Sequence, residues 1–210
     1  MDSEKLLGHP AAKALEALGS NEADTRARID DLLSKRYLGA DAAKAAGVKS
    51  STLARWVDRG LVIPSSPSAG GSGTRHEYTL LDIVRIALMK NLGKLGFSWG
   101  RASLLAFELI PGFTRTLDYA LVHCLATWIC WKAGGLPKMV AHVSPEDAEK
   151  FKNRSSPYPA YFVFHGDGWF YAETPEDFHK LYSALDDQEG AVLINLMAIV
   201  YKAVCVLGVD

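Results

Sequence analysis

Apolar residues recur every three or four positions in the first 34 residues, which is the spacing of one face of an α-helix. Two groups of residues carry the pattern: Ala11, Leu15 and Leu18, and then Ile29, Leu32 and Leu33. The polar run SNEAD separates the groups and offers three candidate helix caps, Ser20, Asn21 and Asp24. We therefore expect residues 1–35 to form a helical N-terminal extension.

Two short helices joined by a tight turn are predicted next. The first ends at Gly47, because glycine readily adopts the left-handed conformation that stops a helix. Ser50 or Ser51 can cap the second helix, which Gly60 closes. This order predicts a helix-turn-helix. The expected helices are Asp41–Ala46 and about residues 51–59.

The second helix has two faces of different chemistry. Leu53 and Val57 lie four positions apart, so we expect them to face the core. Ser51, Thr52 and Arg55 fall on the other side near the N-terminus, which is the part of a recognition helix that reaches bases and phosphates.

A β-hairpin is predicted directly after the helix-turn-helix. LVIP (61–64) can form one strand and RHEY (75–78) the other, with a Ser/Pro/Gly-rich loop at 64–74 between them. Such a hairpin would be a wing, so we assign residues 36–110 to a winged helix-turn-helix domain.

Two further helices are expected to complete this domain. Thr79 with Asp82 forms the capping box of one helix, which ends at Gly96. Ser98 can cap the other, which Pro111 stops.

The C-terminal half has a mixed pattern. Residues 114–132 are apolar almost all round, which predicts a buried or interface helix. Residues 160–164 and 169–173 are predicted to form two strands joined by the turn HGDG. Residues 191–195 form either another strand before a final helix or the start of that helix. The fold class that we expect is therefore mainly α with a winged helix-turn-helix, followed by a C-terminal α/β (α+β) domain with a small sheet. Residues 111–210 would hold a dimerisation helix and this α/β domain, which would serve for sensing or assembly.

Net charge sharpens this division. The 210 residues are 49% hydrophobic and carry a net charge of −1, which excludes a disordered chain. Residues 35–101 hold eleven basic and four acidic residues, a net charge of +7, whereas residues 1–34 carry −3 and residues 102–210 carry −5. A basic segment is the electrostatic footprint of a phosphate-binding module.

Residues 37–109 resemble the winged helix-turn-helix of the MerR and excisionase-like superfamily. The matching motifs follow in order along the chain. They are A-x-x-A-G-V in the 42–48 region, T-L-x-R-W-x-x-x-G-L at 52–61, Gly73, Arg75 and Tyr78 in the wing, T-x-x-D at 79–82 and L-G-F-S at 95–98. The chain departs from the MerR pattern at Ala54, Arg55 and Trp56, where MerR regulators have an Arg followed by two Tyr.

The resemblance implies that Ser51, Thr52, Arg55 and Trp56 face DNA and that Arg75 is the basic residue of the wing. Trp56 as a core residue remains an open alternative, since tryptophan is usually largely buried. The DNA-binding set we expect is Lys49, Ser51, Thr52, Arg55, Trp56, Arg59, Arg75 and Tyr78. MerR regulators also dimerise through a helix placed like residues 114–132, so we expect a homodimer.

No other chemistry stands out. Cys124 and Cys130 are six positions apart and so lie on different faces of a helix, and the histidines lack metal-ligand spacing. The aromatic residues near 158–171 are typical of a sheet core, and a small-molecule pocket is the alternative interpretation. No nucleophile pairs with a base. We expect no metal, no cofactor and no enzymatic activity.

Three hypotheses for function remain. The first is a DNA-binding transcription regulator that binds double-stranded DNA as a dimer, with a small-molecule or protein effector at the C-terminal half. The second is an excisionase-like or phage-packaging architectural DNA-binding protein. The third is a metabolite-binding protein or enzyme whose winged helix binds protein. Two stretches, residues 117–131 and 191–209, are apolar enough to consider as membrane spans, but polar residues interrupt both. Because the start also lacks signal-peptide features, we expect no membrane partner and a cytoplasmic location.

Overall fold

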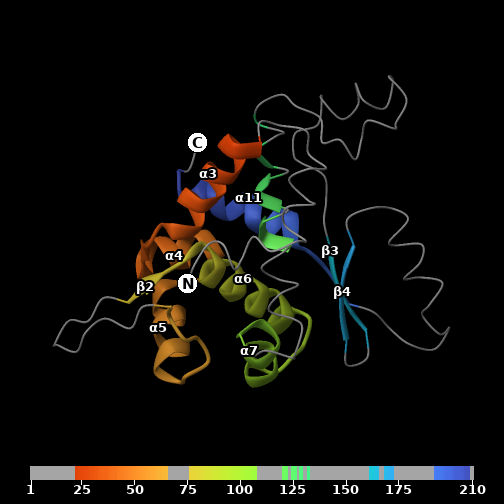
Figure 1. Cartoon of the computed structure of the whole chain (residues 1–210). Coiled ribbons are helices and arrows are strands. Elements are labelled where there is room, and N and C mark those ends of the chain that lie inside the picture. The colour runs from red at the N-terminus through yellow and green to blue at the C-terminus, as the bar shows by residue number, and fades with distance from the viewer. Residues whose placement is uncertain are drawn as a thin grey trace. The chain divides into compact units, whose positions relative to one another are not determined.

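The computed structural model is mostly helical in the residues that it describes (Figure 1). These are residues 22–65, 76–107, 161–165, 168–172 and 192–208, with the helical positions 120–122, 124–126, 128–129 and 132. The helices are α3 (Glu22–Ser34), α4 (Gly39–Ala46), α5 (Ser50–Asp58), α6 (Leu80–Lys94), α7 (Trp99–Phe107) and α11 (Leu196–Val206). The strands are β1 (Tyr37–Leu38), β2 (Glu77–Tyr78), β3 (Tyr161–His165), β4 (Gly168–Ala172) and β5 (Val192–Asn195).

The chain folds into two compact units. We call residues 30–114 and 199–210 the helix-turn-helix unit, and residues 1–29 and 115–198 the sheet unit. Most of α11 therefore belongs with the helix-turn-helix, whereas the sequence grouped it with residues 111–210. Burial of Val200, Ala203 and Val204, one face of α11, accounts for its place in a core.

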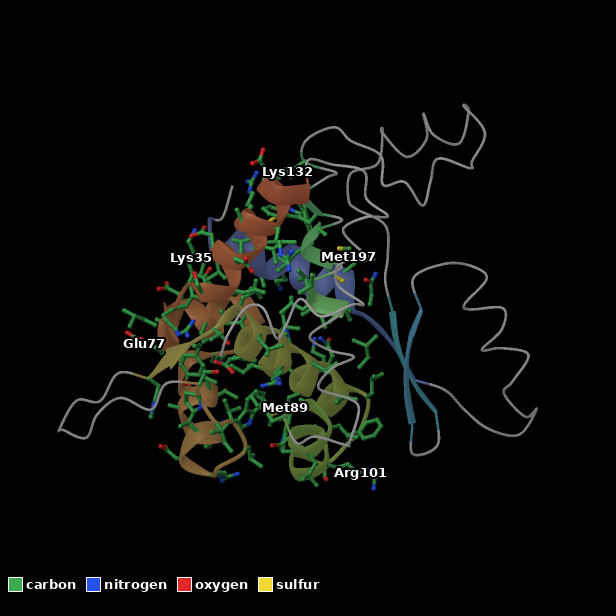
Figure 2. The ribbon with its side chains drawn as sticks, in the orientation of Figure 1. Lys35, Glu77, Met89, Arg101, Lys132 and Met197 are labelled. Atoms are coloured by element: carbon green, nitrogen blue, oxygen red, sulfur yellow. The ribbon has the colours of Figure 1, made fainter. Side chains whose placement is uncertain are left out.

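Helix α6 is the centre of the helix-turn-helix unit. Nine of its fifteen residues are buried, among them Leu88 and Met89, and Met89 lies inside the helical core (Figure 2). Helix α4 packs against both α5 and α6. Its buried residues are all alanines, and these small side chains let the three helices approach closely.

The predicted caps of α6 and α7 are confirmed. The Thr79 amide donates to Asp82 Oδ2 at 2.9 Å, and the Asp82 amide donates to Thr79 Oγ1 at 3.1 Å, which is the capping box. The Arg101 amide donates to Ser98 Oγ at 3.3 Å at the start of α7. Gly96 follows α6 with a φ of 95°.

The predicted hairpin between residues 61–64 and 75–78 is wrong. Strand β2 pairs with β1 instead, with Tyr37 opposite Tyr78 and Leu38 opposite Glu77. Residues 61–64 form no strand, because the Leu61 and Val62 amides donate to the Trp56 carbonyl at the end of α5. A strand needs those amides for its own ladder, and Pro64 has none to offer.

Three predicted helix starts also differ from the structure. Helix α5 begins at Ser50 rather than after a serine cap, because the Leu53 amide already donates to the Lys49 carbonyl at 3.0 Å. Helix α4 begins at Gly39, two residues early. Asp24 lies inside α3, so it does not cap that helix, and Ser20 and Asn21 lie outside the described residues.

The sheet unit contains the two strands predicted around HGDG. Strand β3 is central, antiparallel to both β4 and β5. Residues 192–195 form a strand ahead of α11, which decides between the two alternatives that the sequence left open. The described positions of the predicted 114–132 helix are helical and, up to Ile129, buried.

Candidate nucleic-acid interface

Helix α5 presents a polar face to solvent. Ser51, Arg55 and Arg59 are exposed and follow one another at intervals of four, so they lie along one side of the helix. Thr52 beside them is half-buried, and Lys49 is exposed at the N-cap. The structure thus brings five of the eight predicted site residues together on one helix and its two ends.

Trp56 and Tyr78 are core residues. Trp56 is 5% exposed, and its ring centroid lies 5.0 Å from that of Trp99 on α7. Tyr78 is 2% exposed, and its pKa is raised by burial and by the nearby Asp82 carboxylate. Neither side chain is available to contact DNA in this conformation. The core role left open for Trp56 fits its burial.

The turn before α5 is fixed by Gly47. This residue has a φ of 71°, a conformation that side chains rarely adopt. Its amide donates to the Lys44 carbonyl at 3.1 Å, and the Val48 amide donates to the Ala43 carbonyl at 2.9 Å. These bonds close the end of α4 and set the direction in which α5 leaves it.

The other end of α5 is held by the segment that follows. Gly60 has a φ of 67°, and the Leu61 amide donates to the Trp56 carbonyl at 2.8 Å. The Leu61 carbonyl accepts a hydrogen bond from Ser103 Oγ on α7. Together with the Trp56–Trp99 contact, this bond fixes α5 on α7. The exposed face of α5 is therefore carried by a helix held at both ends.

Asp82 links Ser65 to Thr79. Besides the Thr79 amide, this buried carboxylate accepts from the Ser65 hydroxyl at 2.9 Å and from the Ser65 amide at 3.3 Å. One side chain therefore holds together the two residues that flank residues 66–78. Residues 66–75, including Arg75, lie outside the described residues.

Basic side chains predominate around this face. Between residues 49 and 59 the exposed charges are three bases and one acid, Asp58. Lys44 on α4 and Arg101 on α7 are exposed as well, and Arg101 projects from the outer side of α7 (Figure 2). Phosphate groups are attracted to such a surface through charge alone.

Some contributors were not predicted from the sequence. The link from Asp82 to Ser65 was missed because the capping box already accounted for the carboxylate. The pairing of Trp56 with Trp99 was missed because the two rings are 43 positions apart in the chain. Neither relation leaves a local signal.

A helix-turn-helix whose second helix exposes hydroxyl and guanidinium groups has the architecture of a DNA-binding module. Comparison with known families refines this class. Residues 37–106 match the family described as "MerR HTH family regulatory protein". They form a MerR-family helix-turn-helix domain.

Curated relatives match part of this chain. An uncharacterized HTH-type transcriptional regulator of Mycobacterium bovis is 37% identical over 62 residues. Two proteins of Mycobacterium tuberculosis with the same description give the same identity over the same length. The matched segment covers 30% of this chain and 28% of each relative, so the similarity concerns only part of each protein.

Among the described residues, no helix is long and apolar enough to cross a membrane. No three side chains of His, Cys, Asp or Glu in that part of the chain gather in a way that could hold a metal ion.

Proposed function

We propose that this protein is a sequence-specific, DNA-binding transcription regulator of the MerR type. The observation that carries the proposal is the exposed face of α5, with Ser51, Arg55 and Arg59, inside a MerR-family helix-turn-helix domain. The description of the relatives as HTH-type transcriptional regulators supports a regulatory role.

In this proposal α5 enters the major groove. Arg55 is placed to make a bidentate contact with a guanine, which is the most common specific contact in that groove. Ser51 and Thr52, near the start of the helix, contact base edges or phosphates, and Lys49 and Arg59 contact phosphates. Trp56 and Tyr78 have no direct role, since their burial makes them part of the scaffold.

In this proposal the segment of residues 64–78, which we expected from the sequence to be the wing, lies beside the duplex. Asp82 fixes its two ends through Ser65 and Thr79. Arg75 then contacts the phosphate backbone near the minor groove. Because this contact works through charge, it needs less exact placement than a base contact.

The protein acts as a homodimer on a quasi-palindromic site. Two copies of α5 that bind half-sites one helical turn apart, about 34 Å, give both affinity and register. The helix of residues 114–132 is the proposed dimerisation element, and the rest of the C-terminal half binds the small-molecule or protein effector.

Selection of genomic DNA by the full chain tests the proposal. We expect enrichment of fragments near promoters, with a two-fold symmetric footprint. Arg55→Ala combined with Arg75→Ala should weaken binding to these fragments and flatten its dependence on salt.

Two results would count against the proposal. Unchanged affinity and salt dependence in the double variant would remove the assigned DNA contacts. Tandem footprints at a recombination or packaging site would instead support an architectural DNA-binding protein.

A further inference from the structure

Three lysines gather beside the turn of the helix-turn-helix; we call Lys90, Lys94 and Lys202 the lysine cluster. A Cβ atom built on Gly47 would lie 2.7 Å from Lys90 Nζ and 3.3 Å from Lys202 Nζ. Since both distances start from one point, the two nitrogens are at most 6.0 Å apart. Lys94 follows Lys90 by one turn of α6, so it lies on the same side of that helix.

The lysine cluster holds positive charge that no described residue compensates. Within the part of the chain that the structure describes, none of the three ammonium groups has an ion pair or donates a hydrogen bond. The pKa of Lys90 is lowered, first by burial and then by Lys94 and Lys202, and no carboxylate opposes this shift. The arrangement therefore stores repulsion that a bound anion would relieve.

A structural role accounts for only part of the arrangement. The C-terminal end of α4, at Gly47, carries the partial negative charge of the helix dipole, which attracts cations. However, the Ala43 and Lys44 carbonyls there already accept hydrogen bonds from the Val48 and Gly47 amides. The helix dipole explains why cations are tolerated at the turn. It does not explain why three lysines from α6 and α11 converge there with no hydrogen-bond acceptor among the described residues.

We propose that the lysine cluster binds a phosphate group at the turn of the helix-turn-helix. Ammonium groups bind phosphate as point charges, and two of them within 6.0 Å can share one phosphate. Gly47 contributes by having no side chain, since a Cβ would occupy the space that Lys90 Nζ approaches. Gly47, beside which this site lies, is two residues before Lys49, the N-cap of α5.

Two sources can supply this phosphate, the DNA backbone or a small phosphate-bearing molecule. For the DNA backbone, the inference rests on the proposed function, and α11 would then extend the DNA-binding surface beyond the MerR-family segment. For a small molecule, the site would link that ligand to the position of α5.

The first arm of the test measures DNA binding by the full chain at several salt concentrations. Lys90→Gln combined with Lys202→Gln should weaken binding to specific and non-specific duplexes by the same factor. It should also reduce the slope of log affinity against log salt by about 1. Lys35→Gln, which removes an exposed lysine that is already paired with Asp31 at 2.8 Å, is the control and should leave both quantities unchanged.

The second arm measures the melting temperature without DNA, with inorganic phosphate replacing chloride at equal ionic strength. We expect a saturable rise for the wild type and for Lys35→Gln, but not for the double variant. A non-saturable rise shared by all three proteins is the general effect of an excluded salt and is subtracted.

The two arms together decide the proposal. A reduced salt slope assigns the site to the DNA backbone, and a saturable phosphate effect with an unchanged slope assigns it to a small molecule. If the double variant equals Lys35→Gln in both arms, the lysine cluster is not a phosphate site. If the wild type binds no DNA but keeps the saturable phosphate effect, the proposed function fails and the phosphate site stands.

Discussion

Helices α5 and α6 belong to the same unit but differ in how many of their side chains are buried. Nine of the fifteen residues of α6 are buried, and a capping box closes its start. Only Leu53 and Trp56 are buried among the nine residues of α5, and its N-cap, Lys49, makes no side-chain cap. One helix is mostly core, and the other is mostly surface.

This difference separates stability from binding. Burial of apolar side chains in α6 supplies the free energy of folding, so substitutions there should unfold the unit. The polar face of α5 makes few contacts within the protein, so its substitutions should change DNA binding alone.

The largest effect is expected from Leu88→Ala in α6. Leu88 is fully buried, so its truncation leaves a cavity and should lower the free energy of unfolding by about 2–5 kcal/mol. Urea denaturation measures this change. The matched control is Leu104→Ala on α7, where 46% exposure predicts a change within about 0.5 kcal/mol. Equal effects of the two variants would contradict the assignment of α6 as core.

Asp82→Ala should have the next largest effect. It removes the acceptor of the Thr79 amide and of both Ser65 groups, and the expected loss of stability is about 2–3 kcal/mol. Ser65→Ala removes only one of these bonds, so denaturation should give it less than half of that loss. A larger loss in Ser65→Ala than in Asp82→Ala would be inconsistent with Asp82 as the common anchor.

Gly93→Ala tests the contact between α6 and α7. Alanine favours a helix by about 1 kcal/mol over glycine, but here its Cβ would lie closer than 3.0 Å to the Trp99 ring. We expect a net loss of about 1–2 kcal/mol and a change in tryptophan fluorescence as Trp99 leaves Trp56. Gly100→Ala, with open space around it, should be neutral or stabilising. Stabilisation by both variants would show that the Trp99 ring does not restrict position 93.

Local signals in the sequence predicted much of this fold. The capping box at Thr79 and Asp82 and the turn at Gly47 each depend on residues within a few positions of one another, and both are confirmed. The partner of β2 was not predictable, because the two residues of β1 are too few to show strand periodicity. Lys202 could not be placed near Gly47, since 155 positions of chain separate them.

The candidate site was predicted in part for a similar reason. Helical spacing correctly separated Ser51 and Arg55 from Leu53, because a helix of nine residues has one buried face. Trp56 and Tyr78 were assigned from the order of motif residues, and such an order does not distinguish a residue that contacts a ligand from one that supports the fold. Trp56 packs against Trp99, which comes 43 positions later, and Tyr78 lies opposite Tyr37, which comes 41 positions earlier, so both depend on residues distant in the chain.

The most direct test of the account measures DNA affinity and the free energy of unfolding of the same Arg55→Ala protein. The account predicts a loss of about 10- to 100-fold in affinity for selected genomic sites, since one bidentate base contact contributes about 1–3 kcal/mol. It also predicts a change in unfolding free energy of less than about 0.5 kcal/mol, because Arg55 is exposed. Unchanged affinity, or an affinity loss that only follows a loss of stability, would contradict the claim that the exposed face of α5 binds DNA.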